Sequence, residues 1–210
     1  MSEGRPARSP LTAVVFDLGN VLIDWDPRPA IAAGVGAERT TALFAADDFD
    51  FGVWNHQLDS GMGNAEAEAQ VARDFPHWHP HVVAYREHFS LSLLGPIDGT
   101  VAVLDDLAAG GLDLFAMTNW PAQLFGHARE RFGFLARFGD IVVSGEEGIA
   151  KPDPAIFAVL ADRVRRPLAE CVFVDDRQDN VDAAAAAGMD VIRFTDPARL
   201  RSDLGARGLL

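Results

Sequence analysis

The side chains in this sequence that could do chemistry are carboxylates, one lysine and a hydroxyl–amide pair. They are Asp17, Thr118, Asn119, Lys151, Asp175 and Asp176. Carboxylates can hold a hard Mg2+ ion through oxygen, and one carboxylate can attack phosphorus and form an aspartyl-phosphate. The metal lets an anionic nucleophile approach an anionic phosphate, and a lysine and a hydroxyl stabilise charge on the phosphoryl oxygens. The set therefore indicates phosphoryl transfer.

Most of these residues directly follow a short apolar run, and the runs predict a sheet. The predicted strands are residues 11–16, 112–117, 141–143, 171–174 and 190–194. Helix-like segments lie between them, at residues 101–109, 122–131, 154–163 and 180–187. Continuous apolar runs are typical of strands buried on both faces, and strand–helix alternation favours an α/β fold with a doubly wound parallel sheet. Ligands bind at the carboxyl ends of such strands, so we expect the candidate residues at one edge.

The chain divides into three parts by composition. Residues 1–10 are small and polar with two prolines, which predicts a disordered leader. Residues 11–27 and 95–210 carry the strand–helix alternation of the α/β hydrolase core. Residues 28–94 contain no strand-like run and predict a small inserted helical cap, with helices at 65–73 and 81–94. Four aromatic residues of this segment suggest an apolar wall for the substrate: Phe51, Trp54, Trp78 and Tyr85.

Composition and charge narrow the class of protein. The 210 residues are 49% hydrophobic and 23% charged, which is typical of globular proteins. A net charge of −13 disfavours nucleic-acid and membrane-surface partners, so a metal or Lys151 must reverse the field around an anionic substrate. The single cysteine, Cys171, excludes an intrachain disulfide and fits a reducing, cytoplasmic location. The sequence leaves open whether the protein is a monomer or a homodimer.

Four segments, in order, resemble the motifs of the haloacid dehalogenase-like hydrolase superfamily. They are Phe16-Asp-Leu-Gly-Asn-Val-Leu22, Met117-Thr-Asn119, Ala150-Lys-Pro-Asp-Pro154 and Val174-Asp-Asp-Arg-Gln-Asp-Asn180. The resemblance covers nearly the whole chain and includes a helical cap of the first type. It implies that Asp17 is the nucleophile, that Thr118 and Lys151 bind the transferring phosphoryl group, and that Asp175 and Asp176 hold Mg2+. Asn119 and Asn20 are expected to bind substrate.

Gly19 departs from the usual phosphatase pattern. That position normally carries a second Asp, which protonates the leaving group and gives its backbone carbonyl to the metal. The Gly19 carbonyl can still bind metal, together with Asp17, but the side-chain acid is absent. The Asp-Leu-Gly-Asn variant is similar to that of bacterial sugar-phosphate phosphatases, including glucose-1-phosphate phosphatases. With Asp24 and Asp26 as the first alternative acids, we expect a steep dependence on the leaving group if neither one acts.

Other interpretations of these residues exist. Asp17 could cap a turn, Asp175 and Asp176 could cap the following helix, and Lys151 could be a solvated loop residue. Asn180 could support the site or cap a helix. The histidines of residues 77–81 resemble a metal cluster, but a histidine-rich turn is the simpler reading.

Three functions remain open. The first is a Mg2+-dependent phosphomonoester hydrolase that acts on a small phosphorylated metabolite, with sugar phosphates as one candidate class. The second is a 2-haloacid dehalogenase, which needs no leaving-group acid but leaves Asp175-Asp176 unexplained. The third is a non-catalytic binding protein on the same fold.

Overall fold

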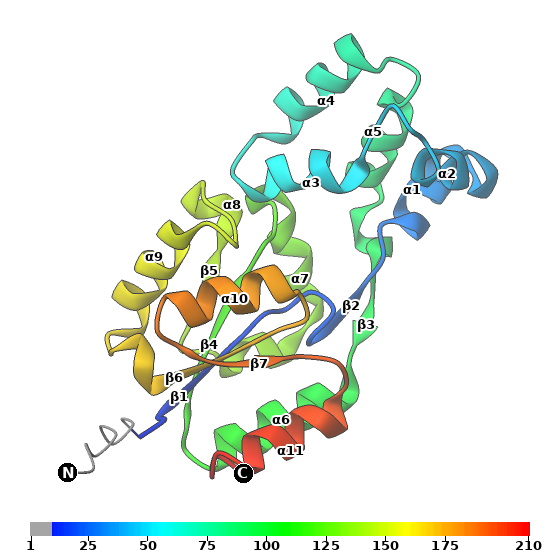
Figure 1. The fold of residues 1–210 in the computed structure, drawn as a ribbon. Coiled ribbons are helices and arrows are strands. Elements are labelled where there is room, and N and C mark those ends of the chain that lie inside the picture. The colour runs from blue at the N-terminus through cyan, green and yellow to red at the C-terminus, as the bar shows by residue number, and fades with distance from the viewer. Residues whose placement is uncertain (1–9) are drawn as a thin grey trace.

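The computed structural model describes residues 10–210, so all of the predicted leader except Pro10 lies outside the described residues. Its centre is a parallel sheet with the strand order β5-β4-β1-β6-β7 (Figure 1). The strands are β1 (Ala13–Phe16), β4 (Asp113–Thr118), β5 (Asp140–Val143), β6 (Cys171–Asp175) and β7 (Asp190–Arg193). Each of the five predicted strands is therefore present, and the predicted doubly wound α/β fold is confirmed.

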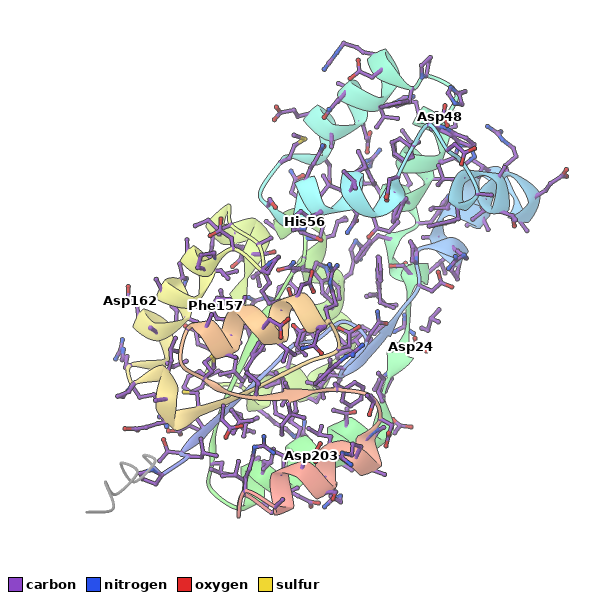
Figure 2. All side chains as sticks on the ribbon, in the orientation of Figure 1. Asp24, Asp48, His56, Phe157, Asp162 and Asp203 are labelled. Carbon is purple, nitrogen blue, oxygen red and sulfur yellow. The ribbon has the colours of Figure 1, made fainter. Side chains whose placement is uncertain are left out.

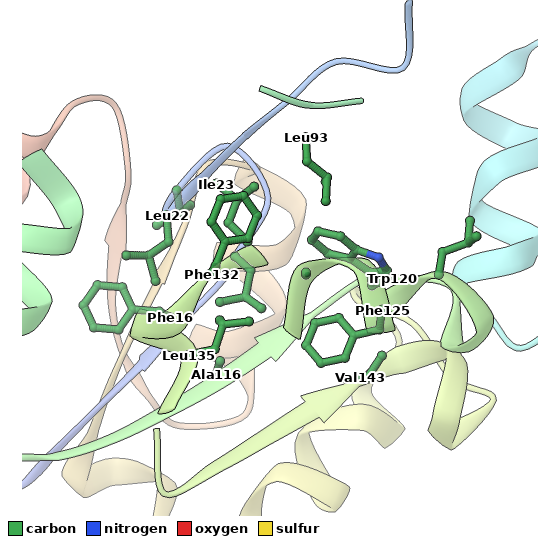
Figure 3. Packing of buried hydrophobic residues seen from close by; sticks show 14 of the residues in the cluster. Phe16, Leu22, Ile23, Leu93, Ala116, Trp120, Phe125, Phe132, Leu135 and Val143 are labelled. Carbon is green, nitrogen blue, oxygen red and sulfur yellow. The ribbon is translucent and has the colours of Figure 1, made fainter. Parts of the chain in front are cut away.

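Alternate residues of β1 pack into opposite layers. Val14 and Phe16 join one apolar cluster, and Ala13 and Val15 join the other. This follows from the two-residue period of a strand. Three helices that cover the sheet contribute to the first cluster, α6 (Asp98–Ala109), α7 (Phe125–Arg131) and α11 (Pro197–Gly205), and side chains of residues 30–85 extend it. Two contribute to the second, α9 (Pro154–Val164) and α10 (Gln178–Ala186). Figure 3 shows the first layer, where Phe16, Leu135 and Phe125 pack above the sheet.

The central position of β1 creates the place where a ligand can bind. After β1 the core strands first extend to one side through β4 and β5, and then return to the other side through β6 and β7. Phe16 is paired with Ala116 of β4 and with Val174 of β6. The residues that follow these strands therefore reach the same edge, at the reversal of strand order where open α/β sheets bind ligands.

Five helices within residues 28–87 form a group that lies apart from the sheet in Figure 1. They are α1 (Arg28–Val35), α2 (Ala37–Phe44), α3 (Phe51–Asp59), α4 (Asn64–Asp74) and α5 (His79–Glu87). The group has its own aromatic packing, since the Phe51 and Tyr85 rings meet edge to face at 5.1 Å. Two antiparallel strands, β2 (Ile23–Trp25) and β3 (Leu93–Pro96), connect it to the sheet.

One predicted helix was wrong over its last residues. The sequence predicted a helix over residues 81–94, but α5 ends at Glu87, a 3-10 turn covers Phe89–Ser92, and β3 follows. The residues of β3 pair with β2 instead, and this pairing satisfies their backbone hydrogen bonds. The remaining short elements are α8 (Ser144–Glu147) and 3-10 turns at Ala122–Leu124, Gly133–Arg137 and Leu168–Glu170. None of the helices in residues 10–210 has the length and apolar character needed to cross a membrane.

Candidate active site

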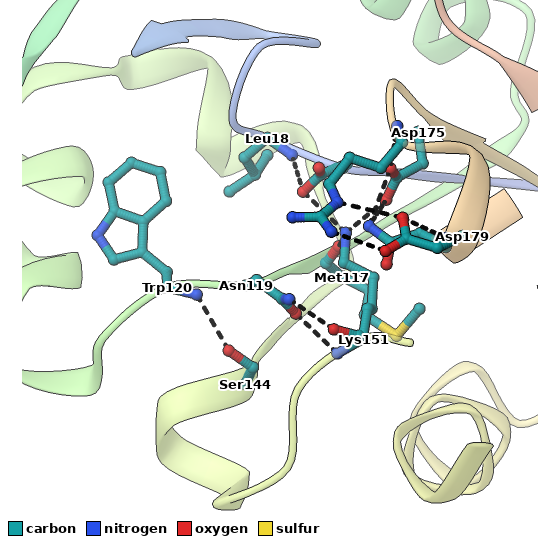
Figure 4. Close-up of polar contacts among 11 residues, drawn as sticks. Leu18, Met117, Asn119, Trp120, Ser144, Lys151, Asp175 and Asp179 are labelled. Carbon is teal, nitrogen blue, oxygen red and sulfur yellow. Dashed lines mark hydrogen bonds and ion pairs between the residues drawn. The ribbon is translucent and has the colours of Figure 1, made fainter. Parts of the chain in front are cut away.

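Lys151 lies at the centre of a buried polar cluster (Figure 4). Its Nζ is 3.0 Å from Asp17 Oδ1 and 2.7 Å from Asp175 Oδ2, and it donates a third hydrogen bond of 2.9 Å to the Met117 carbonyl. Lys151 is the only lysine in the sequence and is 1% exposed, so it is not a solvated loop residue. Burial lowers the pKa of Lys151, but the nearby carboxylates outweigh burial and raise it. The ammonium is therefore a fixed cation.

Asp17 is held by the backbone at the end of β1. Its N–H donates to the Val174 carbonyl at 2.8 Å, which extends the β1–β6 pairing by one residue. Its carboxylate accepts from the Leu18 N–H at 2.7 Å through Oδ1, the same oxygen that meets Lys151. Burial raises the pKa of Asp17 to about 7, Lys151 opposes that rise, and Asp175 adds to it. Both contacts fall on Oδ1, so Oδ2 is the oxygen available for other chemistry.

The two adjacent aspartates differ in their surroundings. Asp175 is fully buried and accepts from Lys151, from the Arg177 N–H at 2.8 Å, and from Asn180 Nδ2 at 3.0 and 3.1 Å. Asp176 is half-buried and lines the cavity. Burial raises the pKa of Asp176, and the neighbouring Asp175 raises it further. Asn180 thus supports the Asp175 side chain.

Oxygens of Asp17, Asp175 and Asp176 all lie within 4.8 Å of one another. Three carboxylates face a single lysine there, so the cluster carries an excess of negative charge in a buried setting, and buried charges require compensation. Carboxylate oxygens are the ligands that Mg2+ prefers. The donor set therefore fits a divalent cation. In the part of the chain that the structure describes, no other group of His, Cys, Asp or Glu residues has this geometry.

Thr118 and Asn119 follow β4 but differ in what they contact. The Thr118 hydroxyl is buried and has no hydrogen-bond partner among the described residues. Such a group costs free energy unless something satisfies it. Asn119 is bonded to the Lys151 backbone in both directions, donating to the carbonyl at 2.8 Å and accepting from the N–H at 2.8 Å. Asn119 therefore holds the loop that carries Lys151, and it also lines the cavity.

A cavity of about 220 Å3 opens beside the cluster. Its lining includes Asp17, Gly19, Asn20, Asn119, Asp176 and Asn180. Gly19 does not have a positive φ, and a Cβ at that position would meet no atom within 4 Å. Asn20 adopts a left-handed backbone with φ 55° and accepts from the Trp25 N–H at 3.2 Å. The glycine is thus not required by its backbone or by crowding.

The aromatic wall differs from the one the sequence suggested. Tyr85 lines the cavity, but Phe51, Trp54 and Trp78 are not among its lining residues. Phe51 and Trp54 are buried against each other at 5.5 Å between ring centroids instead. Trp25, Phe89 and Trp120 take their place. The backbone N–H of Trp120 donates to Ser144 Oγ at 3.0 Å (Figure 4).

The histidine-rich segment forms surface contacts. His77 Nε2 and Trp78 Nε1 bind the two oxygens of Asp48 at 2.9 and 3.0 Å. His81 is buried. These two bonds join the residues just before α5 to the α2–α3 loop, and the histidines of residues 77–81 form no metal-ligand group among the described residues.

Residues from α3 were missed by sequence reasoning. Asn55, His56 and Asp59 line the cavity opposite the sheet edge; Figure 2 shows His56 on the part of α3 that faces the core. The buried positions of α3 are Phe51, Trp54, Asn55, Leu58 and Asp59. This spacing is one face of a helix, so an amide and an acid on an otherwise apolar face were the available signal.

Comparison with known proteins gives consistent matches. A family model described as haloacid dehalogenase-like hydrolase matches residues 11–188. The chain is 29% identical to the sesquiterpene phosphatase astK of Aspergillus oryzae over 190 residues, 88% of this chain and 90% of the relative. It is 28% identical to a phosphoglycolate phosphatase of Yersinia pseudotuberculosis over 199 residues, 88% of this chain and 81% of the relative.

A solved structure supports the fold. The HAD-family enzyme bt-2542 of Bacteroides thetaiotaomicron, crystallised with magnesium and inorganic phosphate, aligns with a TM-score of 0.67 at 19% identity. The alignment covers 89% of this chain and 95% of that chain.

Proposed function

Because the chain belongs to the haloacid dehalogenase-like hydrolase family, we propose that it is a Mg2+-dependent phosphomonoester hydrolase with Asp17 as its nucleophile. The observation that carries the proposal is the contact of Lys151 with both Asp17 and Asp175 in a cluster of three carboxylates. A lone lysine leaves this cluster with an excess of negative charge. A divalent cation would offset this charge and would let an anionic phosphate approach Asp17.

Asp17, Asp176 and the Gly19 carbonyl are the proposed ligands of Mg2+. Asp175 is already saturated by Lys151, Arg177 and Asn180, so we assign it to orienting Lys151 rather than to direct metal contact. Bound there, Mg2+ would supply neutralisation of phosphoryl charge.

The chain's own residues would then carry out the transfer. Oδ2 of Asp17 forms a bond to phosphorus, the bond to the leaving oxygen breaks, and water later cleaves the aspartyl-phosphate. Lys151 holds Oδ1 of Asp17 and thereby fixes the direction of attack. The unpartnered Thr118 hydroxyl would donate to a phosphoryl oxygen, together with Lys151.

Small phosphorylated metabolites are the proposed substrates. The cavity volume of about 220 Å3 suits a phosphate with a small organic group. Asn20 and Asn119 lie on its wall and would bind the substrate. We propose residues 28–94 as a cap that closes this cavity. Sugar phosphates are one candidate class, because the Asp-Leu-Gly-Asn segment is similar to that of sugar-phosphate phosphatases. Small organic acid phosphates are another, because one relative is a phosphoglycolate phosphatase.

The test is a screen of the purified protein with sugar, nucleotide and short-acid phosphates and with 4-nitrophenyl phosphate, in Mg2+ and in EDTA. We expect release of inorganic phosphate that EDTA abolishes and added Mg2+ restores. Turnover of 2-haloacids that survives EDTA would instead establish the dehalogenase. Failure to turn over any ester in Mg2+, including the activated aryl phosphate, would favour a binding protein.

A further inference from the structure

A leaving group needs a proton, and Gly19 offers no side chain to supply it. The alternatives raised from sequence are poorly placed. Asp24 is exposed on β2 (Figure 2), and Asp26 accepts from the Arg28 N–H at 2.9 Å. Neither is among the residues that line the cavity.

Apart from Asp17 and Asp176, Asp59 is the one acid among the described residues that lines this cavity. It is the last residue of α3 and is 8% exposed. Its Oδ2 accepts from Asn55 Nδ2 at 3.2 Å, while Oδ1 is buried without a hydrogen-bond partner among the described residues. A buried carboxyl oxygen of this kind is expected to be satisfied by something that enters the cavity.

No cation forms an ion pair with Asp59 in residues 10–210, and its neighbours on the buried face of α3 are apolar except for Asn55. Burial raises the pKa of Asp59 to about 7, and the negative charge of Asp17 adds to this. Lys151, Asn55 and Arg177 lower the pKa by smaller amounts, and Tyr85, whose own pKa is raised by burial and by Asp59, is neutral. A proton on Asp59 near neutral pH is therefore compatible with its surroundings.

Close packing next to Asp59 holds α3 against the core. Gly61 has φ 98°, and a Cβ there would lie 2.8 Å from Gly148 Cα, so no side chain fits between the two segments. The Asn64 N–H donates to Gln123 Oε1 at 2.9 Å across the same junction. Asp59 is thus positioned two residues from a direct backbone contact with the half of the molecule that carries Asp17.

We propose that Asp59 is the acid that protonates the leaving group, a role that the residue at position 19 cannot fill; this rests on the proposed phosphatase function. When Asp17 bonds to phosphorus and the ester P–O bond breaks, the Asp59 proton moves to the departing oxygen and leaves a carboxylate. That carboxylate then takes a proton from the water that attacks the aspartyl-phosphate. The products are the alcohol, phosphate and free Asp17, and Asp59 regains its proton.

The experiment compares kcat/KM for an alkyl phosphate and for 4-nitrophenyl phosphate, whose leaving group needs little protonation. The proteins are wild type, Asp59→Asn and, as a control, Asp47→Asn. Asp47 is an exposed aspartate in the loop between α2 and α3. We expect Asp59→Asn to lose about 100- to 10,000-fold on the alkyl ester and less than about 10-fold on the aryl ester. Equal losses on both esters, or no loss on the alkyl ester, would overturn the assignment.

Two further measurements separate this proposal from the function on which it rests. If wild type hydrolyses neither ester, the phosphatase itself is wrong; if it hydrolyses both, only Asp59 is in question. The double variant Gly19→Asp/Asp59→Asn should regain at least about tenfold on the alkyl ester relative to Asp59→Asn, because the site has room for the new side chain. Should Asp59→Asn fail to fold, wild type still decides: the alkyl rate should fall above about pH 7 while the aryl rate does not.

Discussion

Lys151 Nζ lies 3.0 Å from Oδ1 of Asp17, although one residue precedes α9 and the other follows the first strand of the sheet. The contact is buried, since the Lys151 side chain is 0% exposed and the Asp17 side chain 10%. Buried ion pairs are not strongly stabilising in themselves, but removal of one partner leaves an unpaired charge. The geometry therefore couples the stability of the fold to its proposed chemistry.

Lys151→Met should lower both stability and activity. Without the ammonium, Asp17 and Asp175 are buried without their cation, and we expect a loss of about 3–5 kcal/mol in the free energy of unfolding. Turnover should be lost as well. Urea unfolding without Mg2+ measures the first effect, and phosphate release measures the second. A variant with wild-type stability would show that the cluster is open to water.

Thr118→Val should lower activity while leaving stability nearly unchanged. The hydroxyl has no partner among the described residues, so an isosteric apolar side chain should change the free energy of unfolding by less than about 1 kcal/mol. If the hydroxyl serves a phosphoryl oxygen in the transition state, kcat should fall by about 100- to 1,000-fold. An unchanged kcat would remove Thr118 from the site.

Asp176→Asn should weaken the use of Mg2+. Asp176 is the less saturated of the two adjacent carboxylates, and loss of its charge weakens a hard-cation site directly. We expect the Mg2+ concentration for half-maximal rate to rise by at least about tenfold. Asp182→Asn is the matched control, since Asp182 is exposed on α10 and bonded to Gln178. An equal metal requirement in both variants would place the ion elsewhere.

Asp59→Asn should change how stability depends on pH. The pKa of Asp59 is raised from 3.8 to about 7 in the folded protein, so between these values the folded state holds a proton that the unfolded state has released. Wild type therefore loses stability as pH rises through this window, by at most about 1.4 kcal/mol per pH unit. The variant lacks this loss, so its stability relative to wild type should increase from pH 4 to pH 7. Parallel stability curves would mean that folding does not raise the pKa of Asp59.

The sheet and the edge that carries the candidate residues could be predicted because local sequence determines them. Each apolar run marks a strand, and the polar residue that follows it (Asp17, Thr118 or Asp175) marks the carboxyl end of that strand. The helical segment was harder, because α1–α3 are only eight or nine residues long and Leu93–Pro96 depends on a distant pairing with β2. The role of Asn119 was also out of reach, since its bonds to Lys151 join residues far apart in sequence.

Asp59 illustrates what sequence reasoning could not supply. Its place in the chain marks only a polar residue at the end of a helix. Its position at the cavity depends on how α3 packs against the core through Gly61 and Gly148, which is a tertiary property. An acid on the buried, mostly apolar face of α3 suggests a functional role. It does not reveal which groups the acid faces in the folded protein.

The most direct test of the account is detection of the covalent intermediate on Asp17. Wild type would be mixed with excess 4-nitrophenyl phosphate and Mg2+, quenched in acid within milliseconds, and digested for mass spectrometry, with Asp17→Asn in parallel. We predict that the wild-type peptide containing Asp17 gains the mass of one phosphoryl group, and that the variant shows neither this modification nor turnover. Phosphorylation of a different residue, or phosphate release at the wild-type rate by Asp17→Asn, would contradict the assignment of Asp17 as the nucleophile.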